Sequence, residues 1–220
     1  MIGLLALLAA CSQSPVELLV PSAQAQDATA PAARLYGLGG TLYVQVYKDP
    51  NTIAAAAAHD HVVKASGWNG SVTWDPASLA SCKVQITVPV SSLSVDEKGL
   101  REQLGYDTFP SDSERAEIKT AMLSDAQLDS AKYPSISYQS TKCEQSGDLV
   151  NVTGNLTIHG VTKSVVLPMS VKADAVNFSA KGSIKIRASQ FGMTPYSALF
   201  GAVKNQDSMI LVIDVTGKPR

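Results

Sequence analysis

His59 and His61 are the residues of this sequence whose type and spacing could do chemistry most directly. In an H-x-H pattern on a strand both imidazoles project to one side, as a metal site requires. Such a site needs a third ligand, and nothing in the sequence places His159 beside the pair. A metal-dependent enzyme or metal-binding protein that uses the pair, with Asp60, is one hypothesis. The other is that the two histidines bond to local backbone and solvent, or meet the head group of a bound molecule.

The rest of the sequence contains no local signature of catalysis. Serines are numerous, but no GxSxG nucleophile elbow is present, and no GxxxxGK[ST] loop is available to cradle a phosphate. The sequence contains 18 Lys and Arg residues and 19 Asp and Glu residues. The net charge of -1 therefore gives no positive electrostatic potential that would attract nucleic acid. We predict that the protein is not an enzyme, requires no cofactor and has no nucleic-acid partner.

The N-terminal segment MIGLLALLAACSQSP indicates export. Its short apolar run ends in LAAC, which resembles the lipobox at which bacterial lipoprotein signals are cut and the cysteine is acylated. We predict a signal peptide over residues 1–11, lipid attachment at Cys11, and a periplasmic protein anchored to a membrane. Ser12 favours the outer membrane. A plain secretory signal with an incidental cysteine is the alternative.

Two further cysteines, Cys82 and Cys143, remain after lipidation. In an oxidising compartment an even number makes a disulfide plausible, although sequence alone does not show that the two meet. A pair of buried free thiols is the other interpretation, because cysteine packs as a small apolar residue.

The elements that must position these residues are strands. Residues 12–36, rich in Ser, Pro, Ala and Gln, predict a flexible tether. From Thr41 onward, apolar residues recur at every second position in about eight segments, separated by polar, Gly- or Pro-marked turns. We therefore predict an all-β, antiparallel barrel of about eight strands, because closure leaves no exposed edge. Two short helices near a barrel end are expected, at 54–58 and from Ser111 onward, where Glu114 completes a capping box.

One segment within this pattern is recognisable, GNLTIHGVTK over residues 154–163. It resembles the signature of the YceI-like family, the polyisoprenoid-binding proteins, and AKYPSISYQST, IRASQFGM and VIDVTG agree in order and spacing. The resemblance covers roughly Gly40 to Gly217 and gives a domain over 37–220. It implies a lipocalin-like periplasmic barrel that binds an isoprenoid or another long-chain lipid in its interior. The chain diverges from the commoner family pattern around His59-Asp60-His61.

The strand phases and the resemblance together give a set of ligand contacts. The inward wall and the barrel mouth would be formed by Leu42, Val44, Val46, His59, His61, Val84, Ile86, Val88, Arg187, Phe191 and Met193. Arg187 is out of phase with Ile184 and Ile186, so it reaches an anionic head only if a bulge turns it inward. The predicted function is to hold or transport a polyisoprenoid, an isoprenoid quinone or a fatty acyl compound. A homodimer and a surface that binds another envelope protein are the partnerships considered.

Overall fold

The structure, a computed structural model, describes residues 33–220. The predicted signal peptide, Cys11 and almost all of the predicted tether lie outside the described residues. Strand β1 begins at Arg34, so Arg34–Tyr36, which we predicted as the end of the tether, belong to the barrel. The reason is packing: the Tyr36 side chain is buried in the core.

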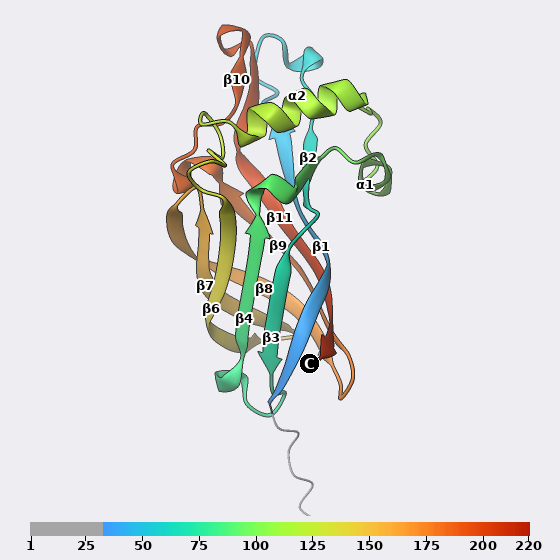
Figure 1. Cartoon of the computed structure of the whole chain (residues 1–220), viewed down its shortest axis with the longest axis vertical. Coiled ribbons are helices and arrows are strands. Elements are labelled where there is room, and N and C mark those ends of the chain that lie inside the picture. Colours follow the sequence, from blue (N-terminus) through green and yellow to red (C-terminus); the bar gives the residue numbers. More distant parts are fainter. Residues whose placement is uncertain (1–32) are drawn as a thin grey trace, which may run out of the picture.

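The predicted antiparallel barrel is confirmed (Figure 1). The wall runs through eight strands in the order β1, β3, β4, β6, β7, β8, β9 and β11, and the pairing of β11 with β1 closes the circle. The strands are β1 (Arg34–Lys48), β2 (His61–Ala65), β3 (Asn69–Trp74), β4 (Lys83–Pro89), β5 (Leu93–Val95), β6 (Ser135–Ser146), β7 (Leu149–Ile158), β8 (Val161–Ala173), β9 (Phe178–Arg187), β10 (Ser197–Ala198) and β11 (Val203–Pro219).

Two wall strands are interrupted at the same level. β2 pairs with β1 at Tyr43–Val46 and β3 pairs with it at Arg34–Leu38, so β2 and β3 act as one strand broken at 66–68. β5 extends β4 in the same way and pairs with β2. Across the two breaks the backbone amide of Ser66 donates to the carbonyl of Ser92 at 3.3 Å. β2 and β5 therefore form the wall at one end of the barrel, and β3 and β4 form it at the other.

The end of the barrel at which β1 starts and β11 finishes is filled by side chains. Tyr36 and Phe178 have ring centroids 5.6 Å apart, and Trp74 meets Phe178 at 5.9 Å. The Tyr36 hydroxyl donates to the carbonyl of Asp174 at 2.7 Å, so its polar atom is satisfied. Aromatic rings bury a large area and pack edge to face, which closes this end.

Helices occupy the opposite end. The alanine run predicted as a helix forms only a single 3-10 turn, Ala55–Ala57, because so short a segment does not offset the cost of helix nucleation. The second predicted helix is α2 (Asp112–Leu123), and its capping box of Ser111 and Glu114 is present. Helix α1 (Lys98–Gln103) was not predicted. Among residues 33–220 no helix has the length and hydropathy needed to cross a membrane.

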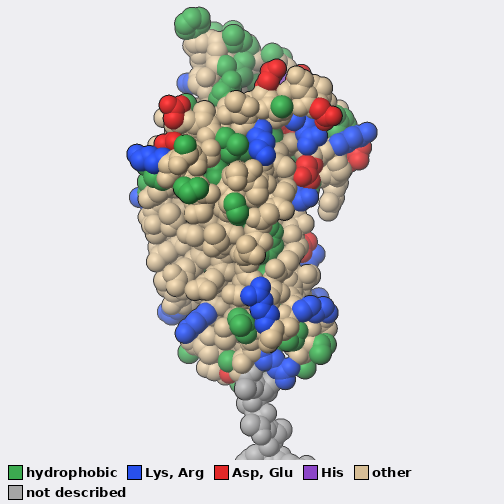
Figure 2. Space-filling view, in the orientation of Figure 1, with side chains coloured by type: hydrophobic (Ala, Val, Ile, Leu, Met, Phe, Trp, Pro, Cys, Tyr) green, Lys and Arg blue, Asp and Glu red, His purple; other side chains and the backbone are tan. Residues whose placement is uncertain are grey.

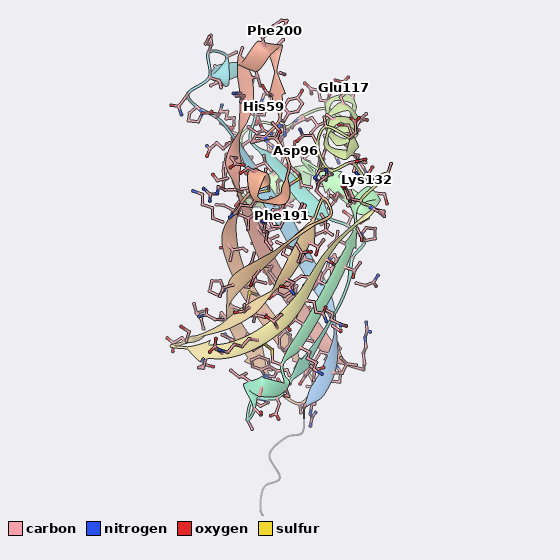
Figure 3. The ribbon with its side chains drawn as sticks, turned by 90° about the vertical axis from the view of Figure 1, so that its left-hand side faces the viewer. His59, Asp96, Glu117, Lys132, Phe191 and Phe200 are labelled. Atoms are coloured by element: carbon pink, nitrogen blue, oxygen red, sulfur yellow. A yellow bond between two sulfur atoms is a disulfide. The ribbon has the colours of Figure 1, made fainter. Side chains whose placement is uncertain are left out.

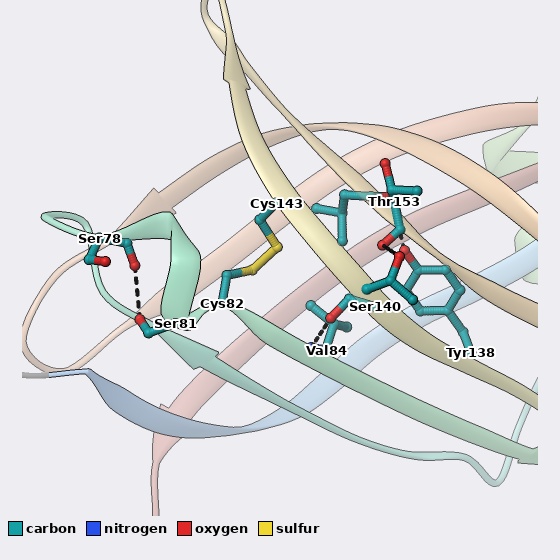
Figure 4. Close-up of a disulfide and its surroundings, with 10 residues drawn as sticks. Ser78, Ser81, Cys82, Val84, Tyr138, Ser140, Cys143 and Thr153 are labelled. Carbon is teal, nitrogen blue, oxygen red and sulfur yellow. Dashed lines mark hydrogen bonds between the residues drawn. A yellow bond between two sulfur atoms is a disulfide. The ribbon is translucent and has the colours of Figure 1, made fainter.

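A disulfide joins Cys82 and Cys143 beside the filled end, which decides between the two interpretations of these cysteines (Figure 4). Cys82 immediately precedes β4 and Cys143 lies in β6, which is paired with β4. Their Cα atoms are 6.0 Å apart, within the usual range for this bond. The bond therefore links two neighbouring wall strands.

Replacing both cysteines by alanine is expected to lower the free energy of unfolding by about 2–4 kcal/mol, because the bond constrains the unfolded chain. The two residues are 61 apart in sequence, which makes the constrained loop a long one. Urea denaturation of the oxidised parent and of the double variant measures the difference. A reduced parent should match the double variant; a double variant as stable as the oxidised parent would contradict the prediction.

Candidate functional site

An apolar cavity of about 790 Å³ occupies the barrel between the filled end and helix α2. Its volume lies in the range of about 300–1,000 Å³ that is typical of small-molecule sites. The wall consists mainly of alternate residues of the strands, including Leu42, Val44, Val46, Val63, Ala65, Ile86, Val88, Ile136, Leu156, Ile158, Val165, Leu167, Ile186, Met209, Leu211 and Ile213. Residues of one strand that share a phase face the same side of the sheet, which explains this lining.

Most of the predicted ligand contacts are brought together here. The cavity is lined by Leu42, Val44, Val46, His59, His61, Ile86, Val88 and Met193. Strand periodicity therefore identified the correct face of β1 and β4.

Three predicted contacts lie outside this lining. Val84 shares the phase of Ile86 but lies nearer the filled end, where it packs against the core. Phe191 is buried in a 3-10 turn and contributes to the core rather than to the cavity surface (Figure 3). Arg187 is exposed, because the β9–β11 register continues through it without a bulge and its side chain stays opposite to Ile186.

The sequence interpretation missed the helical side of the cavity. Glu114, Glu117, Ile118 and Met122 of α2 reach the lining, beside Phe109 from the preceding loop. A helix from Ser111 near a barrel end was predicted, but the sequence did not identify which of its side chains face the interior. Among the described residues, His59, His61, Glu114 and Glu117 are the lining side chains that can carry charge, and no Lys or Arg is among them.

His61 is held by a buried acid that sequence reasoning also missed. Its Nδ1 lies 2.7 Å from Oδ2 of Asp96, and the backbone amide of Val62 donates to Oδ1 of the same carboxylate at 2.8 Å. Arg101 donates to that Oδ1 at 2.6 Å, and the side chains of Asp96 and Arg101 are both 0% exposed. Arg101 also donates to the carbonyls of Asp60 and Thr108. The network ties β2, α1 and the loop after α1 together.

Hydrogen bonding decides the charge of Asp96. Burial alone would raise its pKa, but the hydrogen bonds from His61, Val62 and Arg101 outweigh burial and hold the pKa below its ordinary value. The carboxylate is therefore ionised and only accepts, so Nδ1 of His61 carries the proton that it donates. Nε2 of His61 makes no hydrogen bond to another residue in 33–220 and belongs to a side chain on the cavity wall.

The pKa of Asp96 predicts how stability depends on pH. In the unfolded chain an aspartate titrates near pH 4, and the folded state holds this proton less tightly. Asp96 therefore contributes stability that is fully present above about pH 4 and is lost as the pH falls through its folded pKa. Urea unfolding between about pH 5 and pH 2 should show a steeper loss in the parent than in Asp96→Asn. Parallel curves would contradict the prediction.

The other histidines do not complete a metal site in the part of the chain that the structure describes. No group of three His, Cys, Asp or Glu side chains is placed to hold an ion there. His59 precedes β2 and is exposed, near Glu114 of α2. His159 lies in the β7–β8 turn with a φ of 50°, and its ring packs 4.6 Å from that of Tyr133. The metal hypothesis therefore gains no support from this geometry.

Comparison with known proteins places the barrel in a family. A model of the YceI-like domain matches residues 47–216. The chain belongs to the YceI-like family. The resemblance noted in the sequence is thereby confirmed.

The relatives of this YceI-like protein are distant. It is 28% identical over 132 residues to the UPF0312 protein plu2095 of Photorhabdus laumondii, covering 56% of this chain and 59% of that one. It is 28% identical over 128 residues to protein YceI of Escherichia coli, covering 54% and 58%. The chain thus spans somewhat over half the length of these curated relatives.

Two solved structures share the fold. BcnA of Burkholderia cenocepacia superposes with a TM-score of 0.58 at 20% identity, over 80% of this chain and 95% of that one. The YceI protein of Campylobacter jejuni gives 0.55 at 20% identity, over 72% and 84%. At this identity the likeness supports the YceI-like barrel and nothing finer.

Proposed function

We propose that this YceI-like protein holds a long apolar molecule inside its barrel and carries it in the periplasm. The cargo would be a polyisoprenoid, an isoprenoid quinone or a fatty acyl compound. The observation that carries the proposal is the apolar cavity of about 790 Å³, which remains between filled side-chain packing at one end and α2 at the other. Membership of a family of barrels that bind hydrophobic ligands supports the same conclusion.

The energetics suit such a cargo. Burying one CH₂ group is worth about 0.8 kcal/mol, so a chain of several isoprene units binds through apolar contact alone. Each of the eight wall strands is paired on both sides, so the wall encloses an interior whose surface is mostly apolar. Binding rather than catalysis is the role that this arrangement favours.

The head group would meet the polar side chains at the cavity mouth. Nε2 of His61 is the one best oriented, because Asp96 fixes the ring through Nδ1. Glu114 and Glu117 add carboxylates on the α2 side of the lining, where no described Lys or Arg balances them. An uncharged head is therefore better suited to this mouth than a multiply charged anion. Lipid attachment at Cys11, anchoring to the outer membrane and a homodimer are further parts of this proposal.

The proposal is tested by recovering the cargo. The full chain, purified from a bacterial envelope without organic solvent, is analysed by native mass spectrometry and then by extraction with lipid identification. A stoichiometric adduct that leaves on extraction supports the proposal. Protein that is repeatedly recovered empty, and that does not take up an added polyprenol or fatty acid, would contradict it.

A further inference from the structure

Two loops project together beyond the cavity end of the barrel. One is the β1–β2 loop, which contains Ile53, and the other is the turn from β10 to β11, which contains Leu199 and Phe200. The backbone amide of Ala54 donates to the carbonyl of Ala202 at 2.9 Å, so the loops are joined. Figure 1 shows them side by side at the end opposite to the C-terminus. We call these two loops the apolar tip.

The apolar tip exposes three large hydrophobic side chains. Ile53 is 98% exposed, Leu199 is 70% exposed and Phe200 is fully exposed. Leu199 and Phe200 have φ values of 50° and 54°, a conformation that bulky residues rarely adopt. Figure 3 places Phe200 at the extreme of the molecule, above His59. Single exposed apolar residues are ordinary, but three that gather on one protrusion indicate a contact.

The charge distribution points to the kind of contact. Residues 50–58 and 194–203 contain no Asp, Glu, Lys or Arg, so the apolar tip can leave water without burying a charge. In Figure 2 hydrophobic side chains cover the projecting tip, and the charged side chains visible in this view lie below it. At its base stand Lys48 and Lys204, neither of which forms a salt bridge with a residue of 33–220.

Asp49 and Asp60 stand at the same base and balance the two lysines, so the contact depends on the apolar side chains. Asp49 accepts from the amide of Asn51 at 3.0 Å, and Asp60 accepts from the amide of Lys48 at 2.8 Å. An uncharged apolar cap above a polar base matches the layers of a bilayer, whose hydrocarbon lies beyond the polar headgroups. Tyr196, 40% exposed, has the amphipathic ring that the boundary between these layers favours.

We propose that the apolar tip inserts into the surface of a lipid bilayer and holds the cavity mouth against it. The tip is continuous with the cavity, since Ala57 and Ala58 of the β1–β2 loop line it, as do Tyr196 and Val203, which flank the hairpin of β10 and β11. An apolar molecule could pass from bilayer to barrel along this surface without crossing water. The apolar tip lies at the opposite end of the barrel from the start of β1 (Figure 1).

The test is a pair of tryptophan reporters in the full chain carrying Cys11→Ser, which prevents acylation. Phe200→Trp places the reporter on the apolar tip, and Val176→Trp, at a 59% exposed position in the β8–β9 turn, is the matched control at the filled end. Vesicles of brominated phosphatidylcholine, with and without phosphatidylglycerol, should quench the added emission of Phe200→Trp and leave that of Val176→Trp unchanged. Equal quenching of the two, or none, would overturn the proposal.

A second variant removes the apolar tip without straining it. Leu199→Asn and Phe200→Asn together keep a residue type that tolerates positive φ, and should weaken vesicle binding of a reporter at Ile53→Trp by about tenfold or more. Val176→Asn is the control and should have no effect. If the apolar tip instead joined two copies, sedimentation would show a dimer that these variants dissociate, and the proposal would fall. Quenching at the tip of a protein that binds no apolar cargo would overturn the proposed function alone.

Discussion

Val44→Trp combined with Leu156→Trp is expected to prevent the barrel from binding its apolar ligand. The two residues line the cavity from β1 and β7, which lie four strands apart in a circle of eight and so face each other. Two indole rings that project inward from opposite walls would fill much of the cavity. Each CH₂ group that they exclude removes about 0.8 kcal/mol of binding, so a chain that loses four of them binds about two orders of magnitude more weakly.

The measurement is a titration with a fluorescent fatty acid or a polyprenol, followed by analysis of the lipid that co-purifies. The matched control is Leu35→Trp with Val166→Trp, because both residues are exposed on the outside of the barrel. It should bind as the parent does. Undiminished binding by the inward pair would show that the cargo lies elsewhere.

Arg101→Met is expected to destabilise the fold by about 3–5 kcal/mol. The substitution leaves the ionised Asp96 carboxylate buried and without its cationic partner. It also removes the hydrogen bonds that Arg101 donates to the carbonyls of Asp60 and Thr108. Removing one member of a buried pair costs more than the pair contributes, because the remaining charge stays out of water. Thr108 lines the cavity, so the mouth should loosen as well.

Two controls separate the buried charge from the loss of a long side chain. Arg115→Met makes the same change on α2, where the Arg115 side chain is 31% exposed, pairs with the solvated Asp112 and donates to the carbonyl of Val95 at 3.0 Å. It should lower the free energy of unfolding by about 1–2 kcal/mol, clearly less than Arg101→Met. Asp96→Asn with Arg101→Met removes both charges and should recover part of the loss. Urea denaturation at neutral pH measures all three variants. Equal effects of Arg101→Met and Arg115→Met would refute the argument.

The sequence by itself determined the fold and one face of the site. Period-two alternation is enforced by the geometry of a strand, so Leu42, Val44, Val46, Ile86 and Val88 could be placed on the inner wall from their spacing. The capping box at the start of α2 was equally local, since its bonds span only three residues. Each of these features depends on neighbours along the chain.

The tertiary structure alone decided what depends on distant residues. The sequence could not show which half of the barrel interior is a cavity and which half is filled by side chains. Val84 and Ile86 share a strand phase, yet only Ile86 lines the cavity, because different residues pack opposite them. The Asp96–Arg101 pair was likewise hidden, because an acid and a base five residues apart are more often solvated than buried. The two loops of the apolar tip are more than a hundred residues apart and meet only because β11 returns to pair with β1. Closure of the barrel is the long-range event that creates both the cavity and the tip beside it.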